Sequence, residues 1–198
     1  MPSVPSSRST DRTDPPASSG AGWSGIAKFL HWAVAVLIGA QWVLGLLAVN
    51  WRLSPTKLDL FVWHKSTGML VLTLVAIRLA WRATHPPPPW PSNMPRWERI
   101  AAGVTHGLLY AVMIAMPLSG WVVSSAAGVP FSIYWRIPLP SIVAPDRHLA
   151  EVAAGVHFGL GVALVALLVL HVGAALRHHY VKRDDVLVRM LPWRKTSR

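Results

Sequence analysis

The stretch GVHFGLGVALVALLVLHVG, from Gly155 to Gly173, decides what this chain can fold into. It contains no charged residue, and His157 and His171 are its only polar side chains. A helix on the surface of a soluble protein would carry a polar face, which two histidines do not make. At about 1.5 Å per residue, a helix of this length crosses most of a hydrocarbon core about 30 Å thick. The stretch therefore predicts a membrane-spanning helix that carries two imidazoles.

Three other segments of the chain are as long and almost as apolar. Together, the four predicted helices cover Ile26 to Val49, Leu60 to Trp81, Ile100 to Ala127 and Val152 to Leu176. We therefore expect an all-α, integral membrane four-helix bundle over residues 23–180. Residues 1–22 are expected to form a disordered tail, and residues 181–198 a basic C-terminal tail. A cleaved signal peptide is the competing interpretation of the first segment, but its apolar run is about twice the usual length, so we favour a retained helix.

The net charge of +11 is explained better by membrane topology than by nucleic-acid binding. Three Lys or Arg residues lie in residues 1–28, four in residues 78–99 and seven in residues 177–198, whereas the alternate loops carry only five. By the positive-inside rule, both termini and the second loop face the cytoplasm. We expect membrane lipid as a partner, and no nucleic acid.

The chain contains no cysteine. This excludes Cys-ligated iron–sulfur clusters, covalently attached c-type haem and thiol catalysis within the chain. The sequence also lacks a phosphate-binding glycine loop and a convincing Ser/His/Asp arrangement. Any redox chemistry has to use other ligands.

His157 and His171 lie on one face of the predicted fourth helix. Fourteen residues at about 100° each come within about 40° of four full turns. The two positions are separated by a rise of about 21 Å, which is too far for one metal ion to bind both. One helix would thus contribute a ligand to each of two sites at different depths.

Histidines on the first two predicted helices lie at matching depths. With the N-terminus in the cytoplasm, His31 lies near the cytoplasmic face, and His64 opens the second helix at the outer face. The depths pair His31 with His171 and His64 with His157. Two bis-histidine sites in a chain without cysteine predict two b-type haems.

Two other interpretations of these histidines stay open at this point. Zinc takes three or four protein ligands, commonly with carboxylates, which these helices lack. Each histidine could instead hydrogen-bond to a neighbouring helix, as membrane histidines often do, although matched depths and a shared face favour haem. Small residues one turn after three of the histidines would leave space for a porphyrin; they are Ala35, Gly68 and Gly161.

Further polar residues lie near the two predicted levels. His106, at the start of the third helix, could replace one of the two inner ligands or line a nearby pocket, and we favour the pocket. Arg78 lies fourteen residues after His64 and could bind a propionate of the inner haem or reach lipid phosphate. His178 and His179 follow the fourth helix, where we expect them to be solvated or to face headgroups.

Four of the five basic residues expected on the outer side form a basic collar, although the positive-inside rule depletes such charges there. This basic collar consists of Arg52, Lys57, Lys65 and Arg136. It would attract a small anion arriving from outside, although a solvated loop is the commoner role of such residues. Lys65, next to His64, is also a candidate residue of the cofactor pocket.

The chain resembles the bacterial cytochrome b561 family of four-helix dihaem membrane proteins. The resemblance covers nearly all of residues 26–193. It rests on the HW pair at His31 and Trp32, a histidine that opens the second helix, and HGLLYAVMIAMPLSGW in the third. The most specific part is the closing pattern from His157 through His171 to RHHYVKRDDVLVRMLP. The N-terminal tail departs from the family by being longer.

By motif, the resemblance implies that His31 and His171 bind one haem and that His64 and His157 bind the other. It also implies quinone chemistry in a bacterial inner membrane. Some members of the family take electrons from superoxide at the outer face and pass them to ubiquinone. Superoxide and ubiquinone are thus expectations from the resemblance, and the basic collar is their support in the residues.

We therefore expect a multi-pass transmembrane electron carrier or oxidoreductase. Both axial positions of each iron would be taken by histidine, which disfavours oxygen binding. The alternative is a cytochrome b subunit that anchors a dehydrogenase or hydrogenase partner protein in the membrane. A third interpretation is a haem-free scaffold or transporter whose histidines pack or carry protons.

Overall fold

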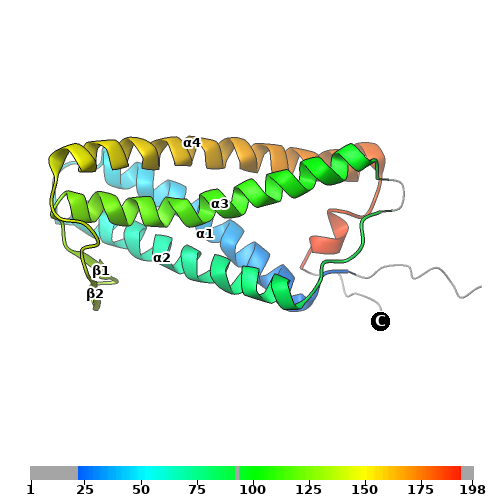
Figure 1. Ribbon diagram of the computed structural model, residues 1–198, viewed down its shortest axis with the longest axis horizontal. Helices are drawn as coiled ribbons and strands as arrows, with labels where there is room; N and C mark the ends of the chain where they lie inside the picture. Colours follow the sequence, from blue (N-terminus) through cyan, green and yellow to red (C-terminus); the bar gives the residue numbers. More distant parts are fainter. Residues whose placement is uncertain (1–21, 92–93, 193–198) are drawn as a thin grey trace, which may run out of the picture.

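A computed structural model describes residues 22–91 and 94–192 of the chain. The expected disordered tail, apart from Gly22, and the last residues of the basic tail, 193–198, lie outside this part. Four long helices run along the longest axis of the molecule (Figure 1): α1 Gly25–Asn50, α2 Pro55–Thr84, α3 Arg96–Ala126 and α4 Arg147–Arg177. Each is long and apolar enough to cross a membrane, so the predicted four-helix membrane bundle is confirmed.

Three of the helices begin at polar caps that lie outside the apolar segments. Ser24, Ser54 and Asp146 each accept a hydrogen bond from the backbone N–H three residues later, at 3.3, 3.4 and 2.9 Å. Pro55 occupies the first position of α2, where its missing N–H has no cost. Because these caps are polar, hydropathy alone predicts helices that start too late, by one residue for α1 and by five residues for α2 and α4.

The bundle consists of two helix pairs. The α3 helix packs along α4, and α1 packs along α2, whereas α1 and α4 make hardly any close backbone contact. Figure 1 shows the two pairs diverging toward the end of the bundle where α1 begins and α4 ends. We call this end the inner end, and the opposite end, where α1 leads into α2 and α3 is linked to α4, the outer end.

A buried apolar cluster joins the four helices at middle depth. It consists of Val34, Ile38, Val71, Val75, Leu109 and Leu164. Leu164 lies seven residues from both His157 and His171 on α4, so the cluster separates the two histidine levels. Outside this cluster, many large apolar side chains are exposed on the helices, as a lipid-facing surface requires.

The segment between α3 and α4 contains a β-hairpin that the sequence did not predict. Strand β1, Phe131–Ile133, pairs antiparallel with β2, Ile137–Leu139, at the outer end (Figure 1). Each strand has only three residues, and Pro138 lies within β2, so no alternating pattern is long enough to indicate a strand. The hairpin is a small addition to the four-helix bundle, and the predicted all-α class stands.

The end of α4 also differs from the expectation. The helix continues into a π-helical turn, His178–Lys182, and Arg183, with φ of 54°, reverses the chain. His178 is buried, and its Nδ1 lies 2.5 Å from a carboxylate oxygen of Asp184. The expectation of a solvated His178 was therefore wrong, because the reversed chain folds back over it; His179 is half-buried.

The C-terminal segment joins separate helices at the inner end. The carboxylate of Glu98, at the start of α3, is buried and accepts hydrogen bonds from Arg177 and Lys182. Farther along the chain, the Met190 carbonyl accepts a hydrogen bond of 2.9 Å from the Trp32 indole of α1. The segment after α4 thus contacts both helix pairs at the end where they diverge.

Candidate functional site

The two histidines at the outer level face each other across the bundle. The ring centroids of His64 and His157 lie 6.3 Å apart, with the ring planes at 81°. Nδ1 of His157 lies 2.9 Å from Ser119 Oγ and 3.1 Å from the Met116 carbonyl oxygen. A carbonyl only accepts hydrogen bonds, so this geometry favours the tautomer with the proton on Nδ1. Nε2 of His157 is then the basic nitrogen.

His64 is held differently from His157. Its backbone carbonyl accepts a hydrogen bond of 3.0 Å from the Gln41 side-chain amide. Its Nδ1 is buried and has no hydrogen-bond partner in the described part of the chain, and the same holds for Gln41 Oε1. No hydrogen bond from these residues therefore orients the His64 ring.

Glycines provide the space for both outer rings. A Cβ atom on Gly45 would lie 3.2 Å from His64 Cε1, and one on Gly120 would lie 3.3 Å from His157 Cε1. Gly68 instead faces the Gln41 side chain. The glycines in contact with the rings thus come from α1 and α3, which sequence spacing from the histidines does not reveal.

Three histidines gather at the inner level. The ring centroid of His171 lies 6.1 Å from that of His31 and 5.2 Å from that of His106. The structure therefore brings together both pairs that depth predicts, and it adds His106 beside His171. In the described part of the chain, no group of three or more His, Cys, Asp or Glu side chains could hold a metal ion.

Arg78 and Tyr110 form the polar side of the inner level. Arg78 Nε donates a hydrogen bond of 2.9 Å to the Tyr110 hydroxyl. The Arg82 guanidinium lies 6.0 Å from the centroid of the Tyr110 ring. Two arginines of α2, Arg78 and Arg82, thus contact the side chain of Tyr110, which belongs to α3.

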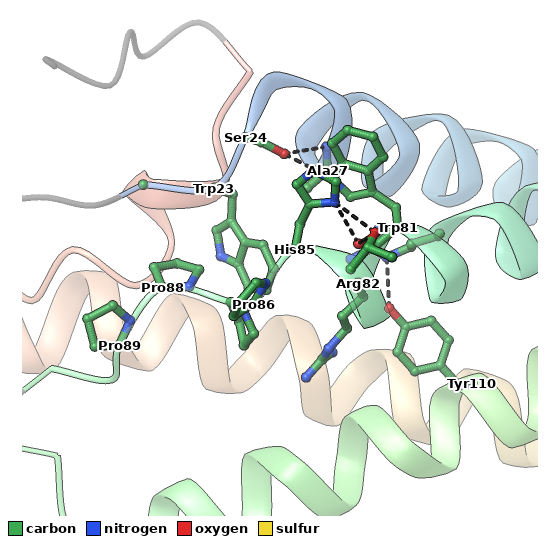
Figure 2. A pocket seen from close by; sticks show the side chains of 14 residues that line it. Trp23, Ser24, Ala27, Trp81, Arg82, His85, Pro86, Pro88, Pro89 and Tyr110 are labelled. Carbon is green, nitrogen blue, oxygen red and sulfur yellow. Dashed lines mark hydrogen bonds between the residues drawn. The ribbon is translucent and has the colours of Figure 1, made fainter.

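A pocket of about 460 Å³ opens beside these arginines. Figure 2 shows Trp23 and the prolines of the linker on one side of it and Tyr110 on the other, with Arg82 extending between them. The indole of Trp81 stacks on His85 with ring centroids 3.7 Å apart and donates to Ser24 Oγ at 3.2 Å. The pocket therefore has flat apolar walls and a small number of hydrogen-bond donors.

Lys65 points away from the outer histidines. Its Nζ donates a hydrogen bond of 3.3 Å to the Pro130 carbonyl and lies 5.0 Å from the centroid of the Phe131 ring. Its charge therefore lies at the base of the hairpin, and its side chain packs against the loop that links α3 to α4.

Comparisons with known proteins assign the chain to a family. Residues 22–193 match the family model described as prokaryotic cytochrome b561. The chain belongs to the prokaryotic cytochrome b561 family. It is 35% identical to cytochrome b561 homolog 2 of Escherichia coli, over 84% of this chain and 89% of that protein. It is 28% identical to the probable superoxide oxidase CybB of Yersinia pestis, over 82% of this chain and 92% of that protein.

Membership of the cytochrome b561 family makes this chain a multi-pass bacterial membrane protein that binds b-type haem and transfers electrons. The residues present fit a bis-histidine haem. Two pairs of imidazoles, His64 with His157 and His31 with His171, lie with ring centroids 6.3 and 6.1 Å apart, and each pair would hold the iron of one haem. The Nδ1 proton of His157 is held by the Met116 carbonyl, so its Nε2 is free for a ligand from outside the chain.

Proposed function

We propose that this cytochrome b561 holds two haems, one between His64 and His157 and one between His31 and His171, and relays single electrons from superoxide to ubiquinone. Haem iron, when bound, supplies the reversible one-electron chemistry. The observation that carries the proposal is the pair of nearly equal ring separations, 6.3 Å and 6.1 Å, at two levels of one bundle. Equal spacing at both levels is what two haems of the same ligation require.

The ring distances favour His31 over His106 as the partner of His171. The separation of 5.2 Å between His106 and His171 is about 1 Å shorter than the separations of the other two pairs. The His31–His171 separation instead matches that of the outer pair, so His31 and His171 would hold the inner haem. We therefore assign His106 to the surroundings of the inner haem; it does not line the pocket beside Arg82.

The protein's own side chains orient the groups around the haems. Ser119 and the Met116 carbonyl hold the Nδ1 proton of His157, which leaves Nε2 free for iron. Arg78 uses Nε for the Tyr110 hydroxyl, and its other guanidinium N–H groups are available for a propionate of the inner haem. The apolar cluster at middle depth excludes water between the two levels.

Two observations support superoxide as the electron donor. One relative of this chain carries the name probable superoxide oxidase. The basic collar, Arg52, Lys57, Lys65 and Arg136, belongs to the outer end, beside the hairpin and the start of α2. Arg52 and Arg136 are exposed, and exposed positive charges around one end of a protein raise the encounter rate with a small anion.

Neutralising Arg136 is expected to slow the reaction with superoxide only at low ionic strength. Arg136 is exposed and follows the turn of the hairpin. The Arg136→Gln variant should react about twofold more slowly than the parent protein in dilute buffer, and the difference should vanish once the Debye length falls to about 3 Å, at 1 M salt. Rates of haem reduction in a superoxide pulse measure this. Arg96→Gln at the inner end is the matched control, and a salt-independent loss in Arg136→Gln would contradict steering.

The inner pocket suits the headgroup of a quinone. A quinone ring is flat and apolar and carries two carbonyl acceptors, and the pocket offers tryptophan and proline walls with the Arg82 guanidinium. The pocket also adjoins Arg78 and Tyr110, at the inner level of histidines. We therefore assign the pocket to ubiquinone.

Removing the Arg82 guanidinium is expected to weaken quinone binding without loss of haem. A hydrogen bond to a charged donor contributes about 1.5–3 kcal/mol, so Arg82→Gln should raise the KM for ubiquinone about tenfold or more. Steady-state quinone reduction measures this, with the pyridine-extracted haem content as the check on folding. Arg96→Gln again serves as control. An unchanged KM in Arg82→Gln would place the quinone elsewhere.

The experiment that tests the proposed function uses the haem-loaded protein in liposomes that contain ubiquinone. Two superoxide anions each lose one electron and become O₂, and these electrons with two protons reduce one quinone to quinol. A steady superoxide source outside the liposomes should therefore yield one quinol for every two superoxide anions consumed. A chain that accepts electrons from dithionite but forms no quinol from superoxide would contradict the assignment of the donor.

A further inference from the structure

The turn of the outer hairpin has an unusual backbone for its residues. Tyr134 and Trp135 occupy its two central positions with φ of 45° and 61°, and the Arg136 N–H donates a hydrogen bond of 3.0 Å to the Ile133 carbonyl. The loop between the strands has three residues, and a turn with positive φ at both central positions favours Asn and Gly there. Large aromatic residues are disfavoured in this region, because Cβ crowds the following carbonyl oxygen. The surrounding contacts must therefore hold the turn in place.

These contacts come from α2, at positions on both sides of His64. The Tyr134 N–H donates a hydrogen bond of 2.8 Å to Oγ of Ser66, a fully buried residue. The Trp63 indole meets the Tyr134 ring at 5.2 Å and the Trp135 ring at 5.7 Å, edge to face in both cases. The Tyr134 hydroxyl also lies 3.4 Å from Thr67 Oγ1.

The hairpin contacts α2 on several sides of the position of His64. Ser66 follows His64 by two residues, which places it about 200° around the helix. Lys65 adds a further contact, because its Nζ donates to the Pro130 carbonyl at the base of the hairpin. The turn and its base together fix the one turn of α2 that carries His64.

His64 needs this support because its ring receives no hydrogen bond from the described part of the chain. Histidines that bind a metal usually donate their second ring nitrogen to a protein acceptor, as His157 does to the Met116 carbonyl. His64 Nδ1 lacks such an acceptor among the described residues. The position of its ring therefore depends on the position of its backbone.

We infer that the aromatic turn Tyr134–Trp135 is a positioning clamp for His64, which keeps this histidine on the outer haem. The inference rests on the proposed role of His64 as an axial ligand. Aromatic residues occupy a turn that suits Asn and Gly because their rings contact Trp63 and hold the His64 turn of α2 in place. Asn and Gly would relax the backbone of the turn but would lose these contacts.

The test exchanges aromatic contact for a relaxed turn. In the double variant Tyr134→Asn, Trp135→Gly, the new residues suit the positive φ values, but the contacts with Trp63 are lost. In the matched control Tyr134→Phe, Trp135→Phe, the rings are kept and the backbone remains disfavoured. If the turn serves only the stability of the hairpin, the Asn–Gly variant should retain the outer haem at least as well as the Phe–Phe variant. If the turn holds His64 in place, the Phe–Phe variant should retain the ligation of the outer haem and the Asn–Gly variant should lose it.

The readout is the binding of CO to the reduced haems. Ferrous haem with two histidine ligands does not bind CO, and the loss of one ligand opens the position. We expect about half of the haem in the Asn–Gly variant to become reactive toward CO, namely the outer haem, with the inner haem unreactive as an internal control. We expect the Phe–Phe variant and the exposed-strand variant Ile137→Thr to remain unreactive.

Two outcomes would overturn the clamp. The first is an Asn–Gly variant that is as unreactive toward CO as the parent protein, together with a His64→Ala variant that loses the outer haem. His64 would then be an axial ligand, but the aromatic turn would not be what holds it in place. If the Asn–Gly variant does not accumulate, Ser66→Ala takes its place, because it removes the hydrogen bonds of Ser66 Oγ with the Tyr134 N–H and with the Ser132 carbonyl of the hairpin. The second outcome against the clamp is a Ser66→Ala variant that is as unreactive toward CO as the parent protein. Retention of both haems in His64→Ala would instead refute the proposed ligand.

Discussion

Replacing His157 by alanine is expected to reduce the haem content from two per chain to about one. The change removes the ligand whose ring faces His64 at 6.3 Å and whose Nδ1 proton is held by Ser119 and Met116. A haem left with one axial ligand, in a pocket with a void where the imidazole lay, is held too weakly to survive purification. The inner haem should be retained at least in part, because the apolar cluster around Leu164 lies between the two levels.

The haem-to-protein ratio of the purified variant, with the reduced minus oxidised spectrum, measures this loss. His148→Ala is the matched control, because His148 is an exposed histidine in the first turn of the same helix. It should keep both haems. A full haem complement in His157→Ala would refute the assignment of the outer site.

The second large effect separates the two histidines that lie beside His171. His31→Ala is expected to abolish the inner haem, whereas His106→Ala should keep both haems and change only the environment of the inner one. The reason is the separation from the His171 ring, 6.1 Å for His31 and 5.2 Å for His106, of which only the larger matches the separation of the outer pair.

Redox titration of the two variants distinguishes the roles of these histidines. His31→Ala should titrate as a single component with the potential of the outer haem. His106→Ala should give two components, with the potential of the outer one unchanged. If His106→Ala lost the inner haem and His31→Ala retained it, His106 and not His31 would be the partner of His171 at the inner haem.

The sequence predicts the membrane bundle and the vertical arrangement of the histidines well, for a physical reason. Position along a spanning helix gives depth directly, at about 1.5 Å per residue, so the levels of His31 and His171 can be matched without a structure. The sequence does not predict which side chains are neighbours at one depth, because this depends on how each helix is rotated about its axis and on which helices it packs against. His106 therefore lies beside His171 although depth alone left its role open.

The same limit explains which site residues the sequence misses. Ser119, Gly45 and Gly120 contact the outer histidines from helices other than those that carry them. Neither their types nor their spacing distinguishes them from the small residues that pack any membrane helix.

The C-terminal end is missed for a third reason. Hydropathy ends the fourth helix near Leu176, and the basic residues that follow indicate a solvated tail. The structure instead buries His178 between Glu98 and Asp184, in a cluster that balances cations with carboxylates from two separate segments. Such a cluster depends on chain reversal at Arg183, which no local pattern predicts.

The central claim is that one chain holds two haems, each between two histidines. The measurement that tests it most directly is the ratio of haem to protein in detergent-purified protein, with its dithionite-reduced minus oxidised spectrum. The account predicts two b-type haems per chain, both with the α-band of bis-histidine iron. One haem per chain would mean that one of the two histidine pairs binds no haem, and would contradict the account.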